Sequence, residues 1–459
     1  MKDLTQGSVL KHLIQMATFL AVSMGVQTLY LLADLYWVGR LGKEAIAAVG
    51  VAGNLTMIVL ALTQMLGVGT TTLIAQAVGQ KDQPRAELIF NQSLAMSFLV
   101  AAGLGVVGFL LRVPYANSLS ADATTAALAR SYLLWFIPGL LLQFPLVTLG
   151  SALRATGIVK PAVGLQVLSV ALNMVLAPLL VFGLIGLPRL GVMGAALATF
   201  ISILIADLLM ILYFIKKYDY LKFRKALWRP QFKTWWAMLR IGLPAGAEFA
   251  LLFLYIIIVY GIIRGFGPAA QAGFGIGARV MQALFLPVVA LSFAVSPVVG
   301  QNFGGRRGDR VRQSVYAAIG LATAIMLLLA LVAHYLPAVL LSGFSQDPRV
   351  IAFGSEYLRI AALNFVAAGI VFSSSSVFQG LGHTIPPLLS SLMRLFLFAL
   401  PAVWLSRQPG FEIRYLWYLS VASQLLQACV NLFLLRRELR KKLVFPEMMD
   451  VPVGAAMSA

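Results

Sequence analysis

The chain has 459 residues, of which 60% are hydrophobic and only 11% are charged, and its mean hydropathy is +0.89. Ordinary soluble proteins carry about 25% charged residues, so this composition excludes a soluble domain and predicts a polytopic membrane protein. The net charge of +19 is compatible with nucleic-acid binding or with a membrane surface, and the single cysteine, Cys429, excludes internal disulfides and thiolate metal sites.

The first apolar stretch, residues 12–41, reads HLIQMATFLAVSMGVQTLYLLADLYWVGRL and is longer than the 20 residues needed to cross a bilayer. Ser23, Gln27, Tyr30 and Asp34 follow one another at helical spacing and form one polar stripe on this stretch. A charge at membrane depth costs about 2.5–3.5 kcal/mol, so the stripe should face a bundle interior or a water-filled cavity. We predict a proton or cation site at Asp34; a structural acid hydrogen-bonded between helices is the alternative.

Eleven further apolar stretches follow, and the first is too long for a signal peptide, so we expect it to be retained. The sequence thus predicts an all-α polytopic membrane protein with 12 transmembrane helices. The expected spans lie near residues 12–38, 45–69, 88–111, 128–150, 161–183, 191–215, 238–263, 271–299, 313–341, 356–378, 386–406 and 414–435.

Lysine and arginine concentrate in the even-numbered connections and in the two termini, and are sparse in the odd-numbered connections. By the positive-inside rule, both termini are predicted to be cytoplasmic, and the basic segments are topology signals, not nucleic-acid sites. The sixth connection is the most basic, and it interleaves Trp228, Trp235 and Trp236 with basic residues, as expected of a segment in the lipid head-group region.

The two halves of the chain share a constant offset, which indicates an internal duplication. Six spans return the chain to its starting side, so the halves are parallel repeats that can rock around a central site. We predict two pseudo-symmetric six-helix lobes: an N-lobe (1–220), a basic cytoplasmic linker (221–237), a C-lobe (238–445) and a tail (446–459). At an offset of 225, Tyr132 falls on Tyr357, Ser151 on Ser376, Gly157 on Gly382 and Pro161 on Pro386.

Two further acids and two bases lie inside predicted spans. The same offset places Ser23 opposite Glu248, which could contact substrate or cation or could simply mark the start of a helix near the interface. For Asp207 we expect a structural role, as partner of an inward-facing arginine or of a helix end. Arg279 and Arg394 are expected to pair with acids or to snorkel.

Several segments carry a resemblance to the multidrug and toxic compound extrusion (MATE) family. The run ADLYWVGRLG at 33–42, followed by EAIAAVG at 44–50, is similar to the first-helix signature of that family. NMVLAPLLVFG at 173–183, GVMGAALAT at 191–199, GLPAGAE at 242–248 and FQGLG at 378–382 also match. The resemblance implies twelve helices in two lobes and antiport of organic compounds against protons or sodium.

Carried over to this sequence, the resemblance assigns Asp34 as the coupling acid, with Tyr30 and Asn173 as its neighbours. Glu248 resembles the acid that follows Gly-Leu-Pro in the seventh helix, and Gln27 and Tyr255 join it as substrate or cation candidates. Ala177 stands where the family often has a second acid. Sodium prefers several oxygen ligands whereas a proton needs one base, so this departure favours a proton, although sodium at Asp34 stays possible.

The sequence therefore predicts a cation-coupled antiporter of the inner membrane, a monomer without cofactor, that exports amphipathic, mostly cationic drugs or metabolites. A flippase for lipid-linked saccharides is the first alternative, and it should need a larger and more basic cavity. A membrane-embedded enzyme is the second alternative. Only His12, His334 and His383 could serve as acid–base histidines, and none has an acid at suitable spacing, so we do not expect an enzyme.

Overall fold

The computed structural model describes residues 1–443, except for the side chains of residues 30–34. The predicted tail, 446–459, and the side chains of Tyr30 and Asp34 therefore lie outside the described residues. Their backbone is part of the first helix, so the chain path at Asp34 is known.

Six long helices form the first half of the chain. Their amino ends are fixed by polar caps where the sequence supplies them: the side chains of Ser8, Asp82 and Asp122 accept hydrogen bonds from the backbone amides of Lys11, Arg85 and Thr125. The helices are α1 (Val9–Gly39), α2 (Lys43–Gly79), α3 (Gln83–Leu119), α4 (Ala123–Ala155), α5 (Lys160–Phe182) and α6 (Val192–Lys216).

The second half repeats this plan with more interruptions. Its elements are η1 (Lys225–Trp228), α7 (Phe232–Ile263), η2 (Arg264–Phe266), α8 (Pro268–Gly304), α9 (Gly308–Tyr335), α10 (Pro337–Ser342), α11 (Pro348–Ala361), η3 (Ala362–Asn364), α12 (Phe365–Gly380), α13 (Ile385–Leu405) and α14 (Ile413–Lys442). Residues 1–443 contain no strand, and twelve segments are long and apolar enough to cross a membrane. The predicted all-α, twelve-span fold is confirmed.

The ninth and tenth spans differ from the predicted ranges 313–341 and 356–378. Helix α9 ends at Tyr335 because Leu336 leaves the helical conformation and Pro337, which has no amide hydrogen, begins the separate helix α10. The tenth span begins eight residues early, at Pro348, where the side chain of Asp347 accepts a hydrogen bond from the Arg349 amide at 2.8 Å. This start was missed because charged residues dilute the apolar signal of α11.

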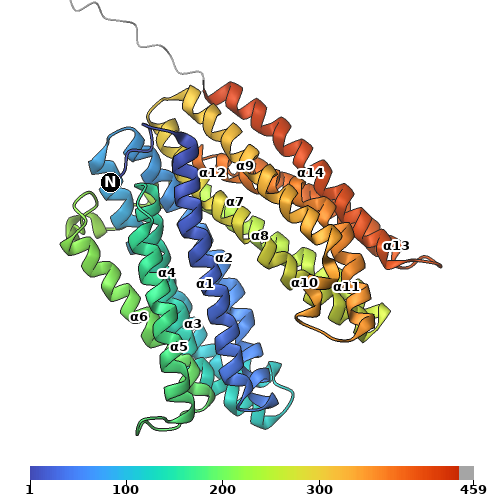
Figure 1. The fold of residues 1–459 in the computed structure, drawn as a ribbon. Helices are drawn as coiled ribbons and strands as arrows, with labels where there is room; N and C mark the ends of the chain where they lie inside the picture. The colour runs from blue at the N-terminus through green and yellow to red at the C-terminus, as the bar shows by residue number, and fades with distance from the viewer. Residues whose placement is uncertain (444–459) are drawn as a thin grey trace, which may run out of the picture.

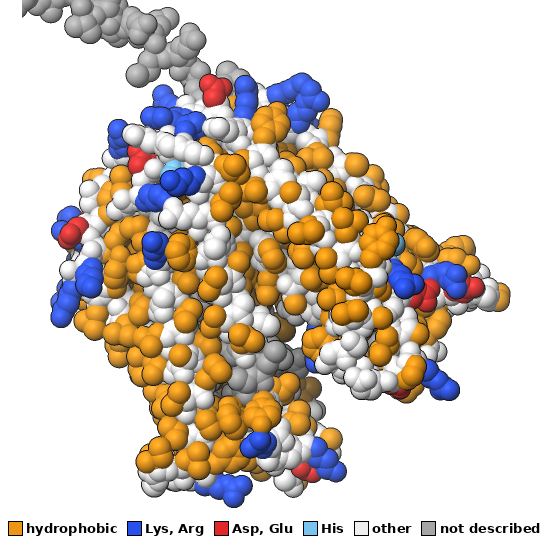
Figure 2. Space-filling view, viewed as in Figure 1, with side chains coloured by type: hydrophobic (Ala, Val, Ile, Leu, Met, Phe, Trp, Pro, Cys, Tyr) orange, Lys and Arg blue, Asp and Glu red, His pale blue; other side chains and the backbone are white. Residues whose placement is uncertain are grey.

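The two halves form two bundles that meet at one end of the molecule and diverge at the other (Figure 1). Helices α1 to α6 make the N-lobe and α7 to α14 the C-lobe, and the N-terminus lies at the end where the lobes meet. Figure 2 shows a hollow between the lobes at the opposite end, and apolar side chains over much of the visible lateral surface. We call these two ends the closed end and the open end.

Glycines allow helices of the two lobes to touch backbone to backbone at the closed end. A Cβ atom built on Gly79 of α2 would lie 2.0 Å from the carbonyl oxygen of Gln301 in α8. One on Gly304 would lie 2.1 Å from the carbonyl oxygen of Gln76. Thr72 Oγ1 adds a hydrogen bond to the Gln379 carbonyl at 2.9 Å. The closed end is thus sealed by backbone contact that larger residues would prevent.

Residues 2–7, the N-terminal segment, bridge both lobes at the same end. The Lys2 amide donates to the Thr156 carbonyl of the N-lobe at 2.8 Å. The Leu4 amide donates to Gln301 Oε1 of the C-lobe at 2.9 Å, and Gln301 Nε2 donates to the Ala155 carbonyl at 2.7 Å. One buried glutamine therefore joins the N-terminal segment and both lobes.

The connection between the lobes is fixed to α3 by three polar side chains, Glu87, Asn91 and Gln92, which we call the α3 clamp. Asn91 Oδ1 accepts from the Arg224 amide and from Trp228 Nε1, both at 3.0 Å. Gln92 Nε2 donates to the Arg229 carbonyl at 2.8 Å, and Glu87 pairs with the Arg224 guanidinium at 2.7 Å. The connection is therefore held against the N-lobe.

Replacing Asn91 by leucine should lower the stability of this connection. It leaves the Arg224 amide and the Trp228 indole without their acceptor, and because both hydrogen bonds are only partly buried, the cost lies at the lower end of about 1–3 kcal/mol for each group. We expect a lower thermal unfolding midpoint of the purified protein and altered Trp228 fluorescence. Asn54→Leu on the exposed side of α2 is the matched control, and equal shifts in the two variants would contradict the clamp.

Candidate functional site

The polar stripe that the sequence predicts on α1 does not have one uniform environment. Ser23 is buried, with 3% of its surface exposed, and its hydroxyl donates a hydrogen bond to Gln166 Oε1 of α5. Gln27, one turn further on, is exposed. The stripe therefore runs from the interior of the N-lobe to its surface before it reaches the backbone of Asp34.

Asn173 lies in the interior of the N-lobe, as a site residue should. It is 3% exposed, and its Nδ2 donates to Thr199 Oγ1 of α6 at 3.0 Å. One turn further along α5, Ala177 is fully buried in an apolar cluster with Leu180 and Ala198. The position at which the resemblance leads us to expect a second acid is thus filled by a packed methyl group, which supplies no oxygen ligand.

Glu248 is the centre of a polar network in the C-lobe. It lies in the body of α7, sixteen residues beyond the first residue of that helix, so it is not a helix-start residue. Ser375 of α12 donates to its Oε2 at 2.7 Å, and Ser391 of α13 donates to its Oε1 at 3.2 Å. Gln427 of α14 donates in turn to Ser391 Oγ at 3.0 Å. We call these four residues the Glu248 network.

The Glu248 carboxylate has no basic partner among the described side chains. Across residues 1–443, apart from the undescribed side chains, no lysine, arginine or histidine nitrogen lies within 4.0 Å of it. Gln427 Oε1, Ser373 Oγ and both amide atoms of Asn431 are buried and have no hydrogen-bond partner among the described groups. Because buried polar groups are normally hydrogen-bonded, this region offers unused donors and acceptors to water, a cation or a substrate.

Arg394 lies one turn beyond Ser391 on α13, and it packs on an aromatic ring instead of an acid. Its guanidinium carbon is 4.9 Å from the centre of the Tyr255 ring, and its Nε is buried without a hydrogen-bond partner. The Tyr255 hydroxyl hydrogen-bonds with Ser420 of α14 at 2.8 Å. The expected pairing of Arg394 with an acid is wrong for the described side chains, because an aromatic face takes that place. Arg279, by contrast, is exposed on α8.

Asp207 of α6 is 4% exposed, and neither carboxylate oxygen has a hydrogen-bond partner among the described groups. The arginine or helix-end partner that we expected is therefore not found in this part of the structure. The acid lies nine residues before the end of α6, too far for interaction with its terminal groups.

Sequence reasoning missed Ser391, Gln427 and Asn431. The signal for the α14 residues was a polar stripe, Ser420, Gln424, Gln427 and Asn431, at three- and four-residue spacing, and all four are buried. Among the described side chains, no group of three or more histidine, cysteine or acidic residues could hold a metal ion.

Comparison with known proteins gives a consistent result. The MatE family model matches residues 20–179 and 244–405, one segment in each lobe. The FAD transporter of Shewanella oneidensis is 28% identical over 381 residues, which cover 82% of this chain and 84% of that protein. The multidrug export protein MepA of Staphylococcus aureus (strain MRSA252) is 26% identical over 451 residues, 94% of this chain and 95% of that protein.

Solved structures agree on the arrangement of the helices. A MOP superfamily transporter from Pyrococcus furiosus Vc1, for which a reverse polarity of the binding pocket suggests a different function, is 25% identical with a TM-score of 0.88. That match covers 96% of this chain and 98% of the other. The Vibrio cholerae MATE transporter VcmN in its bent form is 24% identical, has a TM-score of 0.85, and matches over 96% and 99% of the two chains.

Proposed function

Since the chain belongs to the MATE family of multidrug efflux transporters, we propose that it exports amphipathic, mostly cationic compounds in exchange for protons. The family places it among multi-pass membrane transporters and not among enzymes. The observation that carries the ion-coupling part of the proposal is the Glu248 carboxylate of α7. It accepts hydrogen bonds from serine hydroxyl groups of α12 and α13, and it has no basic partner among the described side chains.

We assign the closed end to the cytoplasm, because the connections at that end are the lysine- and arginine-rich ones. The described conformation is then open to the side of the inner membrane opposite the cytoplasm. In this assignment an outward-facing acid can take up a proton from outside before the lobes reclose.

In the N-lobe we propose Asp34 as the coupling acid, with Tyr30 and Asn173 as its neighbours. Protonation removes a charge from a region of low dielectric and changes the packing of α1, which weakens binding of a cationic substrate. Coupling requires that proton and substrate have different affinities in the two conformations, since tight binding alone shifts no equilibrium.

We propose that Glu248 and Tyr255 of the C-lobe, with Gln27 of α1 in the N-lobe, contact substrate or cation. A serine hydroxyl can donate to an ionised carboxylate and can rotate to accept from a protonated one, so the Glu248 network tolerates both states. Without a basic partner, the charge of Glu248 is neutralised only by a proton or an incoming cation.

Glu248→Gln should therefore reduce proton-driven efflux at least tenfold. Glutamine keeps the size and hydrogen-bonding reach of the side chain but cannot ionise. The measurement is substrate uptake into inside-out vesicles, which corresponds to efflux from the cell, with an imposed pH gradient (acid inside), and Glu44→Gln at the start of α2 serves as the control for loss of one acid. Unchanged efflux in the Glu248 variant would remove this residue from the mechanism.

The choice of ion is tested in proteoliposomes with either a proton or a sodium gradient as the sole driving force. We propose a proton, because Ala177 takes an oxygen ligand away from the N-lobe site. Transport driven by sodium alone would overturn this part and leave the antiport proposal standing. Lipid-linked saccharide, supplied as substrate in the same vesicles, tests the flippase alternative.

A second candidate substrate class is anionic. One relative is named an FAD transporter, and FAD carries a negatively charged diphosphate beside flat rings. Arg394 and Tyr255 offer a guanidinium and an aromatic face in the C-lobe, and no acid among the described residues neutralises the guanidinium. We expect FAD to compete with an ethidium-like cation for transport, and Arg394→Gln to abolish only the FAD effect.

A further inference from the structure

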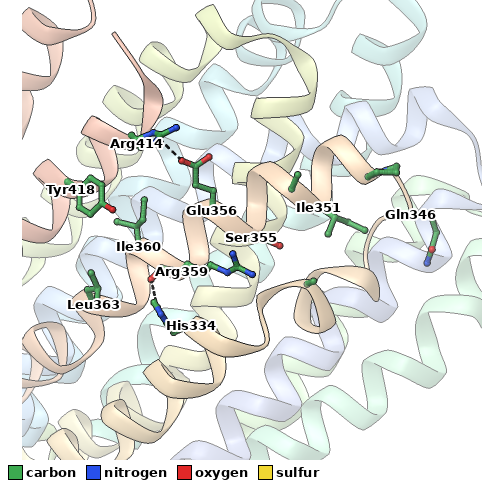
Figure 3. A pocket seen from close by; sticks show the side chains of 13 residues that line it. His334, Gln346, Ile351, Ser355, Glu356, Arg359, Ile360, Leu363, Arg414 and Tyr418 are labelled. Carbon is green, nitrogen blue, oxygen red and sulfur yellow. Dashed lines mark hydrogen bonds and ion pairs between the residues drawn. The ribbon is translucent and has the colours of Figure 1, made fainter. Parts of the chain in front are cut away.

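A groove of about 770 Å³ lies on the C-lobe, between α9, α10, α11 and the start of α14. It is separate from the Glu248 network and lies at the open end of the molecule, where α10 and α11 are found (Figure 1). Figure 3 shows Glu356 of α11 beside Arg414 of α14, with Arg359 further along α11, and all three line the groove.

The groove presents one unpaired positive charge. Arg359 is exposed, and no acid among the described residues lies within 4.0 Å of its guanidinium. Its backbone carbonyl accepts a hydrogen bond from His334 Nδ1 at 3.1 Å, which fixes the end of α9 against α11. The arginine is thus held at a fixed place in the groove while its charged group stays available.

The groove also presents a negative charge. The Glu356 carboxylate is 3.7 Å from Arg414 Nε, but that arginine lies much closer to Glu412, at 2.6 Å. Glu356 is therefore only weakly paired, and 41% of its side chain is exposed. An occupant that carried one positive and one negative group would complement the two sides of this groove.

A buried hydroxyl completes the polar part. Ser355 lines the groove and is only 8% exposed. Its Oγ has no hydrogen-bond partner among the described groups. Figure 3 shows this oxygen near the Arg359 side chain. A hydroxyl beside a guanidinium is a suitable pair of donors for a phosphate oxygen.

An apolar part of the wall lies deeper along the helix. Leu363 is 53% exposed, and it follows Arg359 by one turn, about 6 Å further along the helix axis. Ile360 and Tyr418 also line this part, and Tyr418 is 52% exposed. Charged groups near the end of the spans and apolar groups deeper within them match the order of a lipid molecule.

We infer that this groove binds a phospholipid with a zwitterionic phosphoethanolamine head group. The phosphate lies against Arg359 and Ser355, the ammonium against Glu356, and one acyl chain along Ile360, Leu363 and Tyr418. A free phosphate ion would leave the apolar wall exposed and would face repulsion from Glu356. A cationic drug would leave Arg359 unpaired. This inference does not depend on the ion or substrate of transport.

Native mass spectrometry of the full-length protein, released from detergent with added phosphatidylethanolamine, tests the inference. We expect a retained lipid adduct whose occupancy falls at least fivefold in Arg359→Gln. Arg349→Gln is the matched control, because it removes the same charge from the same helix but does not line the groove. Glu356→Gln should weaken binding of phosphatidylethanolamine but not of phosphatidylglycerol, which has no ammonium group.

Ser355→Leu fills the groove without a change of charge and should also lower the occupancy, which keeps the inference testable if the arginine variant fails to fold. Equal lipid occupancy in wild type, Arg359→Gln and Ser355→Leu would overturn it. So would an equal loss in Arg349→Gln, or displacement of the lipid by inorganic phosphate alone.

Discussion

Asp34→Asn is expected to abolish proton-driven efflux while the protein still folds and inserts into the membrane. Asparagine has nearly the same shape as aspartate, but it cannot bind and release a proton at any physiological pH, so the two conformations no longer differ in proton affinity. Substrate uptake into inside-out vesicles, driven by a pH gradient, should fall to the level of vesicles without the protein.

Two measurements separate a loss of coupling from a loss of structure. Asp219→Asn removes an acid whose side chain is 97% exposed in the connection between the lobes, and it should transport like wild type. Substrate binding to purified Asp34→Asn should persist, since asparagine keeps the polar contacts. Full proton-driven efflux in this variant would refute the role of Asp34.

Gly79→Ala is expected to prevent the closed end from forming. The added Cβ would lie 2.0 Å from the Gln301 carbonyl oxygen and within 2.9 Å of the Gln301 Cα atom. These are backbone atoms of a packed helix and cannot rotate away, so the α2–α8 contact must separate. Transport should drop at least tenfold, because one of the two conformations that alternate has become inaccessible.

Spin labels on the open end of each lobe measure the shift directly. With Cys429 replaced by serine, labels at Ser118 and Ser342 should move closer together in Gly79→Ala than in the parent protein. Gly53→Ala is the matched control in the same helix, because nothing lies within 4 Å of the Cβ it would add. An unchanged label distance in Gly79→Ala, or an equal change in Gly53→Ala, would contradict the proposed seal.

The outline of this fold could be predicted because the signals for it are local. A span is a matter of apolar length, and duplication shows as a constant offset, so both the helix count and the fold class followed from the sequence and are confirmed. The break at residues 362–364 was not predicted, since no proline or glycine marks it. It depends on how α11 and α12 pack against their neighbours.

The candidate site was harder to predict because it depends on which helix faces meet. Glu248 could be singled out as an acid in a span, but the serines of α12 and α13 that hold it come from chain segments more than a hundred residues away. Gln27 and Ser23 share a stripe in sequence yet differ in burial: Ser23 is buried and donates to Gln166 of α5, whereas Gln27 is exposed. The packing of Arg394 on Tyr255 likewise has no signature in the spacing of either helix.

The α3 clamp has a mechanical consequence. Because Gln92 Oε1 also accepts a hydrogen bond from the Gln231 amide at 2.9 Å, the clamp holds the connection to the N-lobe up to the residue before α7, and a pivot between two stiff bodies has to lie at the start of α7 itself. A lobe with helices as long as α2, roughly 55 Å at 1.5 Å per residue, then acts as a lever arm. A rotation of about 10° at the pivot displaces the far tip by roughly 10 Å. Sub-ångström adjustments around a titrating carboxylate, if they tilt the pivot, can thus be amplified into a change of access across the bilayer.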